Sequence, residues 1–546
     1  MMKYLHTFDK RIVDEDNNEV LLEGYGAGNW MIQEAYLFGS GSFDGEFKPF
    51  MRAEAMDRPR TIDQIIRETC GSSYAKTFWN TYYRNYLTND DIQYMKSLGF
   101  NSIRLPLVAR LFIEEEEEIV FNQDMFDILD NVIKLCRENE MYVILDMHAA
   151  ITSQSGIGCD DGVDNSVHLF VEEESMERTI LLWERLAHIY KDEPCIAGYE
   201  LLNEPLALPK WDYMIPLLLD FYQHCIQRIR KIDQKHIIFL QGHRFAKRAD
   251  IFQRDMDPLN NWVLTMHIYE DLPDMGIIGP ILEERERLDV PVWIGETGGS
   301  KHWTVVMYDL LRRYHMGYNV FTYKAVYRKN ACTLATYALP EGFSKIVNYA
   351  LKGSAKPTFK ESREIFNRYL EAIKFASCTL QEQEANAILR KNNVSIPAIG
   401  YDIVNGPGKD YSGTYPYCSF SGYRRECHMQ MVLEQPAYDH GDFKHISSTP
   451  VPKYGDYNNL MLVLHKDEFV SYTLREHNYE GDILAHMKGE HCILNVQLED
   501  EYHTIYVDGV LELKKIYLCH FHKLKNTKLS IRVCEGSLIM KTIMIE

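Results

Sequence analysis

Short apolar runs alternate with amphipathic stretches through residues 1–372, and this alternation limits the possible folds more than any other feature of the chain. Each run is rich in β-branched residues, as in a buried strand, and the stretches between runs carry apolar residues at helical spacing. Residues 172–190 and 213–232 are two such helical stretches. Strands that alternate with helices favour a parallel sheet. The expected strands end at eight residues: Asn29, Pro106, His148, Asn203, Gln241, His267, Glu296 and Lys324.

Two glutamates follow apolar runs of this kind. Glu204 lies in Asn203-Glu204-Pro205 after the run at 196–202, and Glu296 closes the run at 291–295. The interval between the two glutamates is 92 residues, which fits three β/α units of about 30 residues each. We therefore predict a (β/α)8 TIM barrel in which Glu204 ends strand four and Glu296 ends strand seven.

Barrel enzymes carry their chemistry at the C-terminal ends of the strands, and polar side chains gather at those positions here. Two carboxyl groups about 5 Å apart, one protonated and one ionised, are what cleavage of a glycosidic bond with retention requires. Arg104 is expected to keep Glu296 ionised, and Tyr269 to donate a hydrogen bond to it. The candidate residues are Arg104, His148, Asn203, Glu204, His267, Tyr269, Glu296 and Phe321.

Each of these residues alone has an ordinary structural explanation, so the prediction depends on their occurrence together. Asn203 is expected to hold a sugar hydroxyl, and His148 and His267 to bind hydroxyls or support the carboxylates. A metal site made of His148, His267 and a glutamate is a rival use of the same side chains. A barrel that binds carbohydrate without cleaving it is a second hypothesis, and it predicts a broken pair of glutamates.

The chain resembles glycoside hydrolase family 5, the cellulase family of (β/α)8 barrels, over about residues 20–350. This resemblance implies that Glu204 is the acid/base, that Glu296 is the nucleophile and that no cofactor or metal is used. It makes Arg104, His148, Asn203, His267 and Tyr269 the supporting residues. The motifs that carry it are Asn101-Ser102-Ile103-Arg104-Leu105-Pro106, Leu145-Asp146-Met147-His148-Ala149-Ala150, Leu201-Leu202-Asn203-Glu204-Pro205, His267-Ile268-Tyr269 and Ile294-Gly295-Glu296-Thr297-Gly298.

One position departs from the family pattern. Members usually have tryptophan on strand eight as a stacking floor for the sugar, whereas this chain has Phe321, whose ring offers less area. Residues 31–88 are too long for a simple loop, and we expect an elaborated first β/α loop with short helices over the barrel mouth. Trp30 and Glu34 are expected to line the pocket.

The pattern changes past residue 375. Strand-like runs at 469–473, 493–496, 504–507 and 529–533 predict an antiparallel β-sandwich. We therefore divide the chain into a catalytic domain at 1–374, a linker or helix at 375–395 and a sandwich at 396–546. The last segment loosely resembles carbohydrate-binding modules of the family 6 and 35 type. Whether it binds sugar or only packs on the barrel is open. The matching pieces are 396–402, 467–473 and 506–509.

Composition limits the partners. The net charge of -20 disfavours nucleic acid and anionic membranes, and no apolar run reaches the roughly 18 residues of a membrane span. The expected partner is a carbohydrate. Dispersed cysteines and a start without a signal-peptide pattern favour the cytoplasm if the N-terminus is complete, or secretion if a signal peptide has been removed.

The predicted function is a retaining glycoside hydrolase of β-linked glycans or oligosaccharides. Endo action on a β-glucan is the family default, and the long first loop favours exo action on short sugars. An exo-acting furanosidase or galactosidase is the alternative within the same class.

Overall fold

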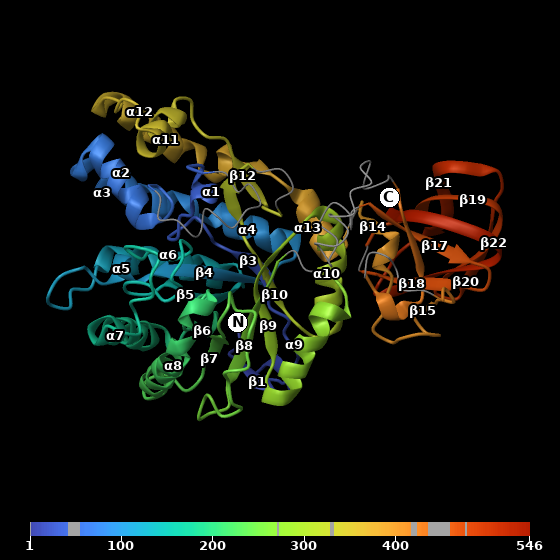
Figure 1. Cartoon of the computed structure of the whole chain (residues 1–546), viewed down its shortest axis with the longest axis horizontal. Helices are drawn as coiled ribbons and strands as arrows, with labels where there is room; N and C mark the ends of the chain where they lie inside the picture. The colour runs from blue at the N-terminus through green and yellow to red at the C-terminus, as the bar shows by residue number, and fades with distance from the viewer. Residues whose placement is uncertain are drawn as a thin grey trace.

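A computed structural model shows a closed parallel barrel followed by an antiparallel sheet (Figure 1). The barrel with its helices occupies the N-terminal two thirds of the chain, and the sheet begins near residue 395. Within the described residues, every helix is too short or too polar to span a bilayer. The structure describes residues 2–41, 55–269, 272–327, 332–391, 393–416, 423–434, 459–475 and 478–546.

Eight parallel strands close the barrel in the order β10-β3-β4-β5-β6-β7-β8-β9. This confirms the predicted (β/α)8 fold and makes β6 strand four and β9 strand seven. The strand residues are almost all buried, because helices cover the outer face and side chains fill the interior. The strands are β3 (Glu23–Gly26), β4 (Ser102–Val108), β5 (Tyr142–Ala149), β6 (Ile196–Glu200), β7 (Ile237–Gln241), β8 (Trp262–Tyr269), β9 (Val292–Gly298) and β10 (Tyr318–Val320).

Three predicted strand ends lie three or four residues past the observed ones, and one of them is Asn203, since β6 stops at Glu200. Strand β3 stops at Gly26, and Asn29 lies in a turn with φ +68°. Strand β10 stops at Val320, and Lys324 begins β11 (Lys324–Val326) in a separate sheet with β12 (Ala335–Tyr337) and β13 (Thr379–Leu380). The buried Lys324 ammonium lies 2.6 Å from an Asp91 carboxylate oxygen, and this ion pair fixes where the chain leaves the barrel.

Amphipathic helices surround the strands. In α8 the residues Phe221, Cys225 and Ile229 are buried and Leu217 is half-buried against them, along the stripe that the helical spacing predicts. No helix follows β7, since residues 242–261 are turns and loop. The helices around the barrel are α4 (Asn89–Leu98), α5 (Ala109–Phe112), α6 (Gln123–Glu138), α7 (Glu173–Tyr190), α8 (Ile215–Arg230), α9 (Met275–Leu288) and α10 (Lys301–Arg313).

The N-terminal end of the barrel is closed by the hairpin of β1 (Leu5–Phe8) and β2 (Arg11–Asp14). Leu5 and Ile12 from this hairpin share an apolar cluster with Phe239 and Trp293 from the strands. The opposite, C-terminal end is therefore the one left for a site.

The first loop contains short helices, as predicted: α1 (Ala35–Phe38), α2 (Pro59–Cys70) and α3 (Ser72–Tyr86). The Arg58 guanidinium donates to the carbonyls of Gly162 and Asp164, so this loop is tied to the loop after β5. Helix α12 (Phe359–Ala372) packs on α2 and α3, and α11 (Phe343–Lys352) packs on α12. Residues 42–54 of this loop lie outside the described residues.

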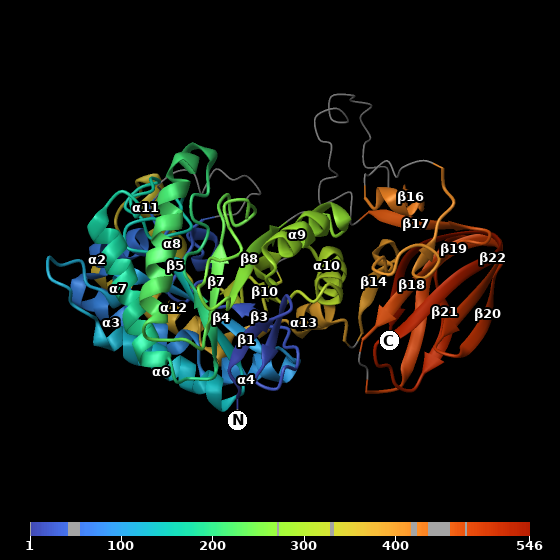
Figure 2. The same cartoon turned by 90° about the horizontal axis from the view of Figure 1, so that it is seen from below.

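The C-terminal region is one continuous antiparallel sheet that curls on itself (Figure 2). Strands β19 and β22 pair along most of their length, and the register shifts between Glu490 and Ile493. Before this irregularity β19 also pairs with β21, and after it with β20. The predicted runs at 493–496 and 529–533 are thus parts of much longer strands. The strands are β14 (Ser395–Pro397), β15 (Tyr411–Ser412), β16 (Gln430–Leu433), β17 (Leu460–His465), β18 (Phe469–Leu474), β19 (Gly481–Leu498), β20 (Glu501–Val507), β21 (Val510–Phe521) and β22 (Thr527–Ile545).

The expected linker or helix is helix α13 (Glu382–Leu389), which packs on α10 where barrel and sheet meet (Figure 1). Asp309 of α10 is buried at this junction and binds Arg313, Arg390 and Arg475 at 2.8 to 3.0 Å. Burial alone would raise the pKa of Asp309, but the arginines hold it well below its usual range. One carboxylate therefore joins the barrel, α13 and the sheet.

Candidate active site

The two glutamates meet at the C-terminal end of the barrel. Glu296 lies within β9, and Glu204 lies four residues past the end of β6 in the left-handed region with φ +42°. The Gln241 side-chain oxygen accepts a hydrogen bond of 2.7 Å from the Glu204 backbone N–H and holds this turn. One carboxylate oxygen of Glu204 lies within 4.8 Å of one from Glu296. Oxygens this close fit retaining glycosidases, whose carboxyl groups lie about 5 to 5.5 Å apart, better than inverting ones, at about 6.5 Å or more.

Glu296 accepts a hydrogen bond on each oxygen. The Arg104 Nη1 donates to Oε1 at 2.7 Å, and the Tyr269 hydroxyl donates to Oε2 at 2.9 Å. Arg104 is fully buried, and although burial opposes its charge, the neighbouring carboxylates raise its pKa above the usual value. A fixed positive charge and a hydroxyl donor therefore lie directly against the two oxygens of Glu296.

Glu204 has the opposite environment. Burial raises its pKa above the ordinary glutamate value, although His148 and Arg104 counteract part of this effect. Its Oε1 lies 2.8 Å from Nδ1 of His267, and its Oε2 accepts a weak hydrogen bond from the Cys159 thiol at 3.7 Å. A carboxyl group with a raised pKa can keep a proton near neutral pH, as a general acid must.

The two histidines are neutral at pH 7, because burial lowers the pKa of both His148 and His267 to about 4. The Asn203 amide lies 3.2 Å from Nε2 of His148, and Nδ1 of His148 lies 2.8 Å from Asp146. Since Asp146 can only accept when ionised, these contacts fit a ring that carries its proton on Nδ1. Nε2 of His267 is buried and has no hydrogen-bond partner among the described residues.

Comparison with known families agrees with this geometry. Residues 66–325 match the model of cellulase, glycosyl hydrolase family 5. The barrel is a glycosyl hydrolase family 5 domain.

Several characterised proteins are similar to the family 5 barrel. A β-xylosidase from Phanerodontia chrysosporium is 32% identical over 276 residues, which are 50% of this chain and 53% of that protein. A glucan 1,3-β-glucosidase from Lachancea kluyveri is 26% identical over 41% of this chain and 49% of that protein. The chain thus spans about half the length of the curated relatives that it matches. A solved endogalactoceramidase structure covers 99% of this chain and 100% of its own, with 13% identity and a TM-score of 0.47.

Sequence reasoning missed two carboxylates at the centre of the family 5 site. Arg104 lies 2.5 Å from Glu200 and 3.0 Å from Asp146, in addition to its bonds to Glu296 and to the Asn203 side-chain oxygen at 2.8 Å. Burial raises the pKa of Asp146 to about 7, although Arg104 opposes the shift. Strand periodicity could have found Asp146, because it lies two residues before His148 and so faces the same side of β5.

The three remaining candidate residues of the family 5 barrel, Phe321, Trp30 and Glu34, differ in their contacts and burial. Phe321 follows β10, and its ring lies parallel to that of His148 at 6.1 Å. A Cβ on Gly28 would lie 2.4 Å from this ring, so glycine makes room for it. Trp30 is fully buried, and its indole N–H donates to the Tyr83 carbonyl, so it has no exposed surface for a ligand. Glu34 is 5% exposed and accepts a hydrogen bond from the Tyr36 hydroxyl.

The donor atoms of Glu204, His267 and Glu296 are close enough to hold a metal ion. Their environment does not suit one, however. Arg104 places a positive charge 2.7 Å from Glu296, and the Tyr269 hydroxyl uses its second oxygen. His148, the other histidine of the predicted metal set, is bonded to Asp146 and Asn203.

Proposed function

We propose that this chain is a retaining β-glycosidase with Glu204 as acid/base and Glu296 as nucleophile. The observation that carries the proposal is the separation of at most 4.8 Å between the two carboxylates. Their different environments support it, because burial raises the pKa of Glu204, while the Arg104 guanidinium and the Tyr269 hydroxyl donate hydrogen bonds to Glu296.

In the first step a Glu296 oxygen attacks the anomeric carbon of the sugar. The glycosidic C–O bond breaks, and the leaving oxygen takes the proton of Glu204. The product is a glycosyl ester of Glu296 and a released alcohol or shortened oligosaccharide.

In the second step Glu204, now ionised, removes a proton from water. The resulting nucleophile attacks the same carbon, and the ester bond to Glu296 breaks. Two inversions give net retention. His267, neutral and 2.8 Å from Glu204, can hold that carboxyl group in place in both of its states.

The proposed substrate is a short β-linked oligosaccharide cleaved from its end at a xylose or glucose unit. The similar β-xylosidase and glucan 1,3-β-glucosidase support this choice. The phenyl ring of Phe321 beside His148 also fits a small sugar without a bulky stacking floor.

The test is a panel of aryl β-glycosides, with xylose, glucose, galactose and arabinofuranose as the sugar, followed by proton NMR of the first product formed. We expect the highest kcat/KM on the xyloside or glucoside and a β-configured initial product. An α-configured initial product would contradict retention. Preference for the galactoside or the furanoside would favour the alternative of a galactosidase or furanosidase. Failure to hydrolyse any of these substrates, or any polymeric glycan, would favour a carbohydrate-binding protein without activity.

We also propose that the C-terminal sheet binds carbohydrate. A hollow of about 340 Å³ lies on the half of the sheet that contains β18, β20 and the first part of β22. Asn495 and Phe469 flank Arg532 across neighbouring strands, and Gln497 lies between Ser530 and Tyr502. The lining residues are Gly408, Lys409, Phe469, Asn495, Gln497, Tyr502, Lys528, Ser530 and Arg532.

The chemistry of this hollow suits a sugar. Amide and hydroxyl groups can bond to sugar hydroxyls, and the Asn495 side-chain oxygen is buried with no hydrogen-bond partner among the described residues. The ring of Tyr502 is 64% exposed at the edge and can stack on a pyranose. Lys409, Lys528 and Arg532 line the hollow, although the net charge of the chain is -20. This local positive charge favours a glycan that carries carboxylates.

Affinity electrophoresis of the Glu296→Ala chain in gels with glucuronoxylan, neutral xylan or mixed β-glucan tests this second proposal. We expect the strongest retardation by the acidic glycan, and its loss in Tyr502→Ala. Tyr517→Ala is the matched control, since Tyr517 is 52% exposed on β21 and does not line the hollow. Equal retardation of the two variants would overturn the assignment.

A further inference from the structure

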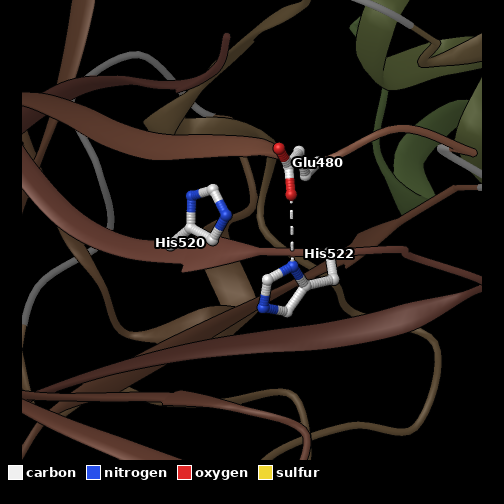
Figure 3. Close-up of side chains that lie close together, drawn as sticks. All are labelled: Glu480, His520 and His522. Carbon is white, nitrogen blue, oxygen red and sulfur yellow. Dashed lines mark ion pairs between the residues drawn. The ribbon is translucent and has the colours of Figure 1, made fainter.

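Two histidines and two carboxylates face one another where the start of β19 pairs with the end of β21 (Figure 3). Glu480 and Asp482 alternate on one strand, and His520 and His522 alternate on the other, so each pair lies on one side of its strand. Asp482 and His520 are direct cross-strand partners. The cluster belongs to the C-terminal sheet rather than to the barrel, and it plays no part in the proposed hydrolysis.

The donor atoms already lie close together. One donor atom from each of Glu480, His520 and His522 lies within 4.8 Å of the others. Nδ1 of His522 is 3.4 Å from an oxygen of Glu480, and Nδ1 of His520 is 2.8 Å from an oxygen of Asp482. In Figure 3 the Glu480 carboxylate and the two imidazole rings point into one shared space.

We propose that Glu480, His520 and His522 bind a zinc ion, and that Asp482 orients His520. Zinc sites with three protein ligands of the His and carboxylate type keep a fourth position for water. Zinc-bound histidines almost always donate their second ring N–H to a carboxylate, a backbone carbonyl or water, and Asp482 can accept that hydrogen bond from His520.

The required adjustment is small. Ligands at the usual zinc distances of about 2.0 to 2.2 Å lie roughly 3.3 Å apart in a tetrahedron, and the Glu480 to His522 contact of 3.4 Å already meets this value. The side chains of Glu480 and His522 are 72% and 86% exposed, so they are free to rotate onto an ion. Two imidazoles also favour zinc or copper over calcium and magnesium, which prefer oxygen ligands.

A bound ion would join Glu480 before β19 to His522 after β21. It would therefore stabilise the folded sheet by mass action, since the unfolded chain holds these ligands apart. This inference does not depend on the proposed glycosidase activity.

Titration calorimetry of the full-length chain, purified without a histidine tag and freed of metal with EDTA, tests the site with zinc chloride. We expect one saturable zinc site per chain. His520→Ala and His522→Ala should each weaken its zinc affinity at least about tenfold. Asp482→Asn should do the same, since losing an orienting carboxylate alone lowers metal affinity by about 10- to 100-fold. Zinc should raise the unfolding temperature of the unaltered chain and not that of His520→Ala.

His491→Ala is the matched control. His491 is 81% exposed, and its Nδ1 lies 2.8 Å from an oxygen of Asp508. These two residues form a histidine–carboxylate pair that belongs to no three-ligand cluster among the described residues. Its variant should bind zinc like the unaltered chain. Zinc affinity unchanged in both His520→Ala and His522→Ala, or no saturable binding at all, would overturn the proposal.

Discussion

The barrel mouth and the C-terminal sheet each contain a histidine–carboxylate pair with Nδ1 2.8 Å from oxygen, yet the two pairs differ in their surroundings. In the barrel the His267 side chain is 1% exposed and that of Glu204 is 11% exposed. In the sheet the values are 42% for His520 and 50% for Asp482. The same contact therefore occurs once between buried side chains and once between solvent-exposed ones.

The difference shows that burial, rather than the contact itself, gives the barrel pair its chemistry. Burial lowers the pKa of His267 to about 4 and raises that of Glu204, so that a neutral imidazole holds a carboxyl group able to carry a proton. The exposed pair stays solvated and is free to meet an ion from solution. Four changes test this contrast.

The largest effect is expected from Glu296→Ala. The change removes the proposed nucleophile and should lower kcat/KM on aryl β-glycosides by a factor on the order of 10⁴ or more. Glu480→Ala removes a glutamate of the exposed cluster and should leave hydrolysis unchanged. Comparable losses in both variants would erase the distinction between the two regions.

Asp309→Asn tests how firmly the two regions are joined. It should lower the free energy of unfolding by about 3–5 kcal/mol, since three arginines lose a buried counter-charge. The folded pKa of Asp309 lies below its unfolded value. Its stabilising contribution is therefore complete above about pH 4 and is lost as the pH falls further. Urea unfolding followed by circular dichroism measures the change, and an unaltered midpoint would contradict this role.

His267→Gln should change the pH dependence of stability. The folded pKa of His267 is about 4 against 6.5 unfolded, so its stabilising contribution is present above pH 6.5 and is lost as the pH falls toward 4. The loss amounts to about 3 kcal/mol, at 1.36 kcal/mol for each pKa unit. The pKa of Asp146 is raised to about 7, so this group lowers the stability as the pH rises. Asp146 is present in both the unaltered chain and the His267→Gln variant, so its contribution cancels when the two are compared.

Urea midpoints of the unaltered chain and the His267→Gln variant between pH 4 and 7 give this difference directly. A His267→Gln slope equal to that of the unaltered chain would show that His267 is not held neutral by burial.

The smallest effect is expected from Cys159→Ala. The thiol lies 3.7 Å from Oε2 of Glu204, and this contact favours the ionised carboxylate. Its removal should raise the Glu204 pKa and move the basic limb of the kcat/KM profile to higher pH, with little change in the maximum. Cys225→Ala, at a buried thiol of α8, is a control for packing. A basic limb shifted to lower pH would contradict the assignment of Glu204 as the acid.

The barrel and its paired glutamates could be predicted because both follow from local patterns. Asn203 and Glu204 follow an apolar run, and Glu296 ends another, so strand position alone places them at one end of the barrel. The strand ends were less predictable. Val320 rather than Lys324 ends β10 because Lys324 pairs with Asp91, more than 200 residues earlier in the chain.

Long-range contacts account for what the sequence left out. Glu200 lies beside Arg104 only because β6 and β4 flank β5 in the barrel. The Asp309 junction joins α10 to Arg390 and Arg475, and no spacing rule relates these positions. In the C-terminal region, local alternation marked short strands, whereas the pairing of β19 with three other strands decides the curled sheet.

Trapping of the covalent intermediate tests the central claim most directly. The chain is incubated with an activated 2-deoxy-2-fluoro β-xyloside or β-glucoside, digested, and mapped by mass spectrometry. The proposed roles predict one glycosyl adduct per chain, on the peptide that carries Glu296, together with loss of activity. An adduct on Glu204 or another residue, or hydrolysis of natural β-glycosides with inversion and no adduct, would contradict them.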